Sequence, residues 1–214
     1  MTPQEKETFC RLVGALFSPP DLEIAEWVHQ RKLASWLERI GQDLGADETP
    51  IQGFFIEGGP DEVLKELRGA YDRLFLGLGE GICPVESYYK PWTRDPHCSL
   101  SFAGDKGLLM GDSALHLMEI YRHCHLEVSD ELRSCPDHLI LEIEFLSYLY
   151  RDAGDREIKR FIEDHLDWIP LLKEEFEQCD PHPFYRAAME ILDRFLQKER
   201  TRLNRGVNGE KKVH

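Results

Sequence analysis

Apolar side chains recur three or four residues apart along most of the chain, in segments separated by proline and glycine. This is the period of an amphipathic helix, and no segment shows the two-residue alternation of a strand. At the start, Thr2, Pro3 and Glu5 form a capping box, which predicts a helix over residues 3–17. The same pattern predicts further helices over residues 21–30, 32–44, 60–76, 108–123, 136–150 and 183–198, and one after Gly154 that is marked by Ile158, Phe161, Ile162 and Leu166.

Two prolines mark the ends of predicted helices. The segment after Pro136 is the most apolar in the chain, and its apolar side chains cover nearly the full helical circumference, which predicts a central helix. Because proline is tolerated as the first helical residue, we expect this helix to begin at Pro136. We expect Pro170 to end or kink the helix that precedes it.

Residues 77–107 break the helical pattern. This stretch holds five glycines and three prolines and shows no lasting period. Loops longer than about 12 to 15 residues are uncommon in compact domains unless they are functional or disordered. The aromatic side chains Tyr88, Tyr89 and Trp92 lie in its middle and could supply the burial that ordering requires. We therefore expect an ordered loop that lies over a groove.

Together these patterns predict an all-α fold, a single bundle of about eight or nine helices with one long ordered or partly ordered loop. A length of 214 residues and a hydrophobic fraction of 42% suit one domain with one core. We expect this domain to span residues 1–197. Residues 198–214 carry six basic and two acidic side chains, and we expect this tail to fray.

The charge of the chain restricts its partners. A formal net charge of −14 repels a phosphate backbone, so we expect no nucleic acid and favour basic ligands. No apolar run approaches the about 18 to 20 residues that span a bilayer, and the first residues do not resemble an export signal. The six cysteines are scattered, without a C-x-x-C pair. We expect no stable membrane insertion and a reducing, cytoplasmic setting.

The nearest approach to a metal-ligand cluster is His116 with His123, Cys124 and His125. Neighbouring helical residues point in different directions, so the last three cannot all face one ion within a helix. Histidines also suit the negative end of a helix dipole. We therefore expect no metal site.

No catalytic arrangement stands out. Glu142 and Glu144 lie about 200° apart around a helix axis, so at most one of them faces any cavity. The chain lacks the G-x-S-x-G elbow of a serine nucleophile and the glycine-rich loop that holds phosphates. We expect no catalytic residues and no enzymatic activity.

The loop and the start of the central helix offer binding chemistry instead. Aromatic rings beside the Glu86 carboxylate provide apolar faces and a place for a cation, which suits a peptide that carries arginines. Asp137 and His138 place hydrogen-bonding groups at a partly open helix end. In the alternative interpretation, the rings pin the loop to the bundle, Asp137 is a plain cap and His138 is a surface histidine. Both interpretations remain open at this point.

Several motifs, in this order, resemble those of the TorD/DmsD/NarJ family of redox-enzyme maturation chaperones, over most of the chain. They are Tyr71-x-x-Leu74-Phe75, Pro84-Val85-Glu86-Ser87-Tyr88-Tyr89, Gly111-Asp112-Ser113-Ala114-Leu115, Pro136-Asp137-His138-Leu139-x-x-Glu142-x-x-Phe145-Leu146, His165-Leu166-Asp167-Trp168-Ile169-Pro170 and Pro183-Phe184-Tyr185-Arg186. The resemblance implies an all-α, cytoplasmic, non-enzymatic chaperone for the catalytic subunit of a molybdenum or tungsten oxidoreductase. It implies binding to the twin-arginine signal peptide and to the apoenzyme until the molybdopterin cofactor is inserted. That cofactor belongs to the client, and none is expected for this chain.

The family motifs also imply which residues bind the peptide. They are Pro84, Glu86, Ser87, Tyr88 and Tyr89 in the loop, and Asp137 and His138 at the helix start. We add Trp92 from its chemistry alone. Some relatives have Trp and Gly before the loop serine where this chain has Val85 and Glu86. This difference leaves open which signal peptide, or leader, the chain prefers. The protein is expected to be a monomer or a domain-swapped dimer.

Two other functions compete with this one. A metal-dependent phosphohydrolase could use an all-α scaffold that carries His and Asp, although it needs a His-Asp dipeptide where this chain has the reversed Asp137-His138. An adaptor could bind one folded partner through the apolar loop, and it would then ignore an isolated signal peptide.

Overall fold

The computed structural model describes residues 1–44, 51–77 and 81–210. Within these ranges the chain forms ten α-helices and one 3-10 helix, and the only β pairing is an isolated bridge between Val85 and His138. The predicted all-α fold is confirmed. The elements are α1 (Pro3–Phe17), α2 (Leu22–His29), α3 (Lys32–Leu44), η1 (Ile51–Phe54), α4 (Pro60–Phe75), α5 (Glu86–Tyr89), α6 (Asp112–His123), α7 (Leu139–Asp152), α8 (Asp155–His165), α9 (Ile169–Gln178) and α10 (Pro183–Glu210).

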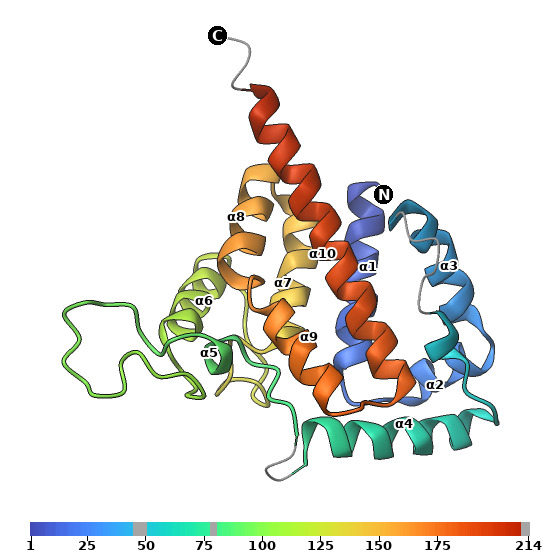
Figure 1. The fold of residues 1–214 in the computed structure, drawn as a ribbon. Helices are drawn as coiled ribbons and strands as arrows, with labels where there is room; N and C mark the ends of the chain where they lie inside the picture. Colours follow the sequence, from blue (N-terminus) through green and yellow to red (C-terminus); the bar gives the residue numbers. More distant parts are fainter. Residues whose placement is uncertain (45–50, 78–80, 211–214) are drawn as a thin grey trace.

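The core lies between α1, α7 and α10. These three helices run alongside one another, and α4 lies crosswise at one end of the bundle (Figure 1). Phe9 of α1 and Phe195 of α10 place their ring centroids 4.4 Å apart, and Ile143 of α7 is fully buried. Burial of such a side chain contributes about 1.5–3 kcal/mol, so the apolar stripes of these helices hold the bundle together.

The first helix begins as its sequence predicts. The Glu5 backbone N–H donates to Thr2 Oγ1 at 3.2 Å, and the Thr2 N–H donates to Glu5 Oε2 at 2.6 Å. This capping box satisfies donors that the first turn of a helix leaves unpaired.

Three predicted helix bounds are wrong. The central helix α7 begins at Leu139, because Pro136 and Asp137 lie in a turn that the His138 N–H closes on the Cys135 carbonyl, and His138 then pairs with Val85 before α5. α6 begins at Asp112, since Met110 has a φ of 59°, which interrupts a helix. Pro170 lies in the first turn of a separate helix, α9, where a missing N–H costs nothing.

The segment between α5 and α6 extends away from the bundle as an open loop (Figure 1). It is ordered by its own hydrogen bonds: the Trp92 N–H donates to the Asp105 carbonyl and the Thr93 N–H to that of Ala103, both at 2.9 Å. The predicted break at 77–107 therefore contains one helical turn, α5, and continues to Gly111. Residues 78–80 of the predicted loop lie outside the described residues.

The predicted end of the last helix at residue 198 is also wrong, because α10 continues without interruption to Glu210. Arg200 Nη2 donates to the Leu166 carbonyl at 2.7 Å, and Arg202 pairs with Asp155 and with the buried Glu199. Contacts with α8 and its neighbours thus hold residues that look like a free basic tail in the sequence. Residues 211–214 of that tail lie outside the described residues.

The attachment of this helix end can be tested with Leu203, whose side chain is 2% exposed. Replacing Leu203 with alanine should lower the free energy of unfolding by about 2–3 kcal/mol, because it leaves a cavity in packed surroundings. Urea denaturation would measure this loss. Alanine at the exposed neighbour Arg205 should have little effect, and equal small losses in both variants would show that the end of α10 does not pack.

Candidate functional site

The structure brings together two sequence segments that carry most of the predicted site residues. The Leu139 N–H donates to the Pro84 carbonyl and the Glu86 N–H to the Asp137 carbonyl, both at 2.9 Å. The Asp137 carboxylate accepts the Ser87 N–H at 2.7 Å. The single turn of α5 is therefore joined to the start of α7, 50 residues further along the chain.

The predicted residues differ in exposure. Tyr88 is 36% exposed, and Pro84, Trp92 and His138 are half-buried. The others are buried: Glu86 0%, Ser87 1%, Asp137 0% and Tyr89 8%. Four of the eight predicted binding residues are therefore buried, and the role of all eight in binding stays a prediction.

Glu86 is buried between the side chains of Lys90 and His165. Its Oε1 accepts a hydrogen bond from Lys90 Nζ at 2.5 Å, and its Oε2 lies 2.9 Å from His165 Nδ1. Burial by itself raises the pKa of Glu86, but the hydrogen bonds and charges of His165 and Lys90 lower it below the ordinary value. Glu86 is therefore an ionised carboxylate inside the protein.

His165 continues this network to the surface. Its Nε2 lies 2.8 Å from Nδ1 of His116, an exposed residue of α6. Burial and the neighbouring His165 lower the pKa of His116. A chain of hydrogen bonds thus links the buried Glu86 through two imidazoles to solvent.

Glu142 lies close to Glu86, but its pKa is shifted in the opposite direction. It is fully buried, and its Oε2 accepts a hydrogen bond from Trp168 Nε1 at 2.9 Å. Burial, with the negative charge of Glu86, raises the pKa of Glu142 well above its usual value. Glu144 is exposed, so only one of the two carboxylates faces inward, as predicted.

Tyr89 fastens α5 to α9. Its ring stacks on Trp168 with centroids 5.2 Å apart, and its hydroxyl donates to Glu175. The interpretation of the loop aromatics as pins is therefore correct for Tyr89. Trp92 contacts Phe102 across the open loop, with centroids 5.2 Å apart, whereas Tyr88 presents about a third of its surface to solvent.

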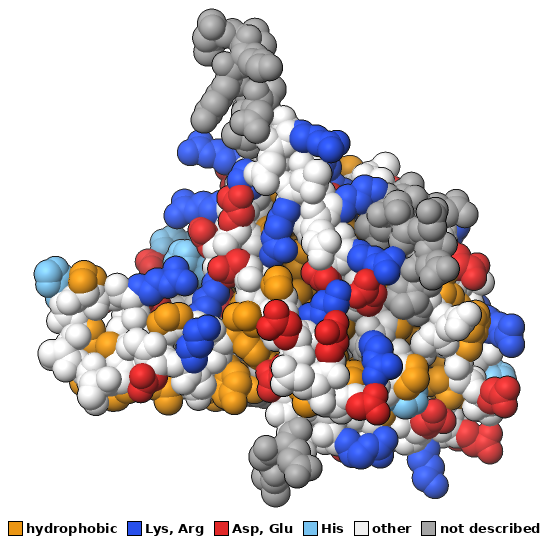
Figure 2. All heavy atoms as spheres, viewed as in Figure 1, with side chains coloured by type: hydrophobic (Ala, Val, Ile, Leu, Met, Phe, Trp, Pro, Cys, Tyr) orange, Lys and Arg blue, Asp and Glu red, His pale blue; other side chains and the backbone are white. Residues whose placement is uncertain are grey.

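Exposed apolar side chains gather around the open loop and α6. Figure 2 shows hydrophobic atoms over the lobe that this loop forms. The exposed residues there are Leu100, Phe102, Leu109, Leu115 and Met118. Contiguous exposed apolar surface is typical of sites that bind other proteins.

Three hollows in the described part of the chain lie away from the predicted site, and the groove expected beneath the loop stays a prediction. Hollows of about 160, 430 and 680 Å³ are lined by Tyr121 and Tyr148, by Arg73 and His182, and by Arg11 and Asp21, among others. None of these hollows includes a predicted site residue. In the structure, α5 packs directly on its neighbours through the contacts of Tyr89 with Trp168 and Glu175.

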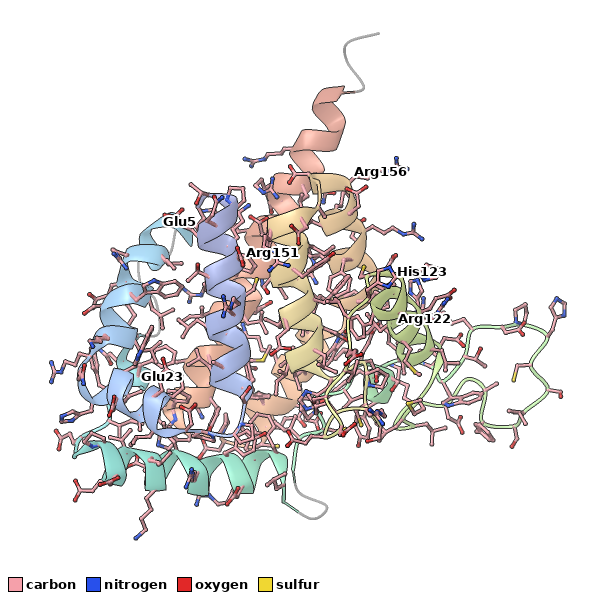
Figure 3. The ribbon with its side chains drawn as sticks, turned by 180° about the vertical axis from the view of Figure 1, so that it is seen from behind. Glu5, Glu23, Arg122, His123, Arg151 and Arg156 are labelled. Atoms are coloured by element: carbon pink, nitrogen blue, oxygen red, sulfur yellow. The ribbon has the colours of Figure 1, made fainter. Side chains whose placement is uncertain are left out.

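The candidate metal ligands are not brought together. His116 contacts His165, while His123 Nδ1 lies 2.8 Å from the Glu119 carbonyl at the end of α6 (Figure 3). In the described ranges no three His, Cys, Asp or Glu side chains are arranged to hold a metal ion. The same part of the chain holds no helix with the length and apolarity needed to cross a bilayer.

Sequence reasoning missed Lys90, Trp168 and Glu175 as parts of this region. His165 and Trp168 lie in a motif that carries the family resemblance, but only the fold shows that they surround α5. Lys90 follows the loop motif directly, and its spacing of four from Glu86 could have indicated the ion pair.

The comparison with protein families decides the relationship. The model of the family described as nitrate reductase delta subunit matches residues 26–180. The chain belongs to this family. This match confirms the resemblance that the sequence motifs indicated.

Curated relatives agree with this assignment. The chain is 30% identical to the chaperone protein TorD of Vibrio cholerae over 45% of this chain and 49% of the relative. It is 22% identical to TorD of Vibrio parahaemolyticus, over 80% and 81%. A selenate reductase assembly chaperone of Thauera selenatis is 30% identical over 41% and 51%. The chain thus spans about half the length of the first of these relatives.

Proposed function

We propose that this delta-subunit family member is a non-enzymatic assembly chaperone for the catalytic subunit of a molybdenum or tungsten oxidoreductase in the cytoplasm. Its family and the names of its relatives support this proposal. The observation that carries it is the backbone pairing of residues 84–87 with residues 137–139, which places two motifs of the family resemblance side by side and leaves Tyr88 exposed next to them. The molybdopterin cofactor is assigned to the client.

We infer that the ligand of this surface is the client's twin-arginine signal peptide. The half-exposed Tyr88, Trp92 and His138 offer apolar faces and polar tips, and the exposed apolar residues nearby suit the hydrophobic part of a leader. The net charge of −14 favours the capture of a basic segment. An isolated leader should therefore bind, in contrast to the behaviour of an adaptor for a folded partner.

Titration of synthetic leaders by calorimetry tests this function. A twin-arginine leader should bind more tightly than its twin-lysine version, since a guanidinium donates in a bidentate geometry that an ammonium lacks. Tyr88→Ala should weaken binding about tenfold, as loss of an exposed aromatic anchor typically does. Tyr148→Ala, a half-buried tyrosine of α7 outside the site, is the matched control. Equal affinity for the two leaders would contradict arginine recognition.

A further inference from the structure

Lys90 fills a pocket of oxygen atoms at the end of α5. Its Nζ lies 2.5 Å from Glu86 Oε1 and 2.5 Å from Asp167 Oδ1. It also donates to the Asp164 carbonyl at 2.8 Å. The Lys90 side chain is 13% exposed, while the Glu86 side chain is fully buried and that of Asp167 is 47% exposed. The oxygens therefore extend from the partly exposed Asp167 inward to the buried Glu86, and the Lys90 ammonium occupies the space between them.

The oxygen set has more acceptor capacity than one ammonium uses. An ammonium has three N–H donors, and Lys90 directs them to three separate oxygens. A guanidinium has five donors in a planar fork and can hold two carboxylates at once. It is also less strongly hydrated than an ammonium, so it enters a partly buried site more readily.

Lys90 competes with any cation that approaches from solvent. Because it is tethered next to the site, its effective concentration is of the order of millimolar or higher. A peptide lysine brings the same chemistry without that advantage and therefore competes poorly with Lys90. A peptide arginine gains contacts that Lys90 cannot make, and the flexible lysine stem lets the ammonium move out to water.

We propose that Glu86, Asp167 and the Asp164 carbonyl form a guanidinium-binding subsite that Lys90 occupies in the free protein. Binding of an arginine-bearing leader then exchanges one cation for another, which explains how a buried Glu86 takes part in recognition. This inference rests on the proposed function. It adds a subsite that includes two aspartates outside the family motif of the loop. It also adds a lysine whose competition lowers the apparent affinity for any leader.

Two substitutions of Lys90 in the full chain test the exchange in opposite directions. Lys90→Met keeps most of the stem but removes the competitor, so both twin-arginine and twin-lysine leaders should bind about tenfold more tightly, by the same factor. Lys90→Arg supplies a better competitor, so both should bind more weakly. A merely structural Lys90 predicts the reverse order, with Lys90→Met weaker than Lys90→Arg, and this result would overturn the subsite.

Amine labelling of the wild-type chain supplies a measurement that needs no variant. An amine-reactive ester, read out by peptide mass spectrometry, should modify Lys90 slowly in the free protein and faster when the twin-arginine leader is bound. Lys173 pairs with Glu190 and Asp193 in a similar way and should not change. Lower reactivity of Lys90 on binding would overturn the exchange.

The outcomes separate this inference from the function on which it rests. If the wild type binds the twin-arginine leader but Lys90→Met binds it no more tightly, the subsite is wrong and the function stands. If neither protein binds either leader, both are wrong. If only Lys90→Met binds, Lys90 blocks the site completely in the wild type and the subsite is supported.

Discussion

Glu86→Gln should lower the free energy of unfolding at pH 7 by about 3 kcal/mol, whereas Glu142→Gln should change it by less than about 1 kcal/mol. Both carboxyl groups are fully buried, so side-chain size and burial are matched. The difference lies in charge. The pKa of Glu86 is lowered by His165 and Lys90, so we expect an ionised carboxylate, and an amide leaves the Lys90 ammonium without its buried partner.

We expect Glu142 to carry a proton at pH 7, because burial and Glu86 raise its pKa. An amide at this position keeps an oxygen that can accept from Trp168 Nε1 and adds no new charge. Urea denaturation of the two variants and the wild type at pH 7 compares them directly. Equal losses in both variants would show that the two acids share one protonation state.

Acid should destabilise the wild type through His138, and His138→Asn should remove this effect. Burial lowers the pKa of His138 from 6.5 to about 4, so the folded state resists protonation more than the unfolded chain does. The resulting stability is present above pH 6.5 and is lost as the pH falls toward 4. This shift corresponds to about 3 kcal/mol.

The geometry at the start of α7 gives this shift a structural cause. His138 is the N-cap, and its Nδ1 accepts the Ile140 N–H at 3.2 Å, which a protonated ring cannot do. Asparagine also caps helices but does not titrate. Unfolding measured at several pH values should therefore show a smaller loss in His138→Asn than in the wild type. The exposed His125→Asn is the control, and parallel curves for wild type and His138→Asn would refute the role of His138.

Local signals in the sequence determined most of the helices and the family. These signals are the capping box of Thr2 and Glu5, the apolar period and the break after α4. Each depends on residues close together in the chain, where helical geometry alone determines the direction in which a side chain points. The motifs around Ser87 and Asp137 identified the relatives for the same reason, since each is a short continuous stretch.

Only the tertiary structure decided the environment of these residues. In the sequence, Glu86 looks like a carboxylate that is free to bind a ligand. In the fold it is buried and pairs with His165, which lies 79 residues further along the chain. The end of α10 looks like a basic tail until Asp155 and the Leu166 carbonyl hold it. Side-chain periodicity indicates which face of a helix is buried, but not which other segment covers that face. Contacts between distant segments therefore follow only from how the helices pack, and these contacts set the environment of a titratable group.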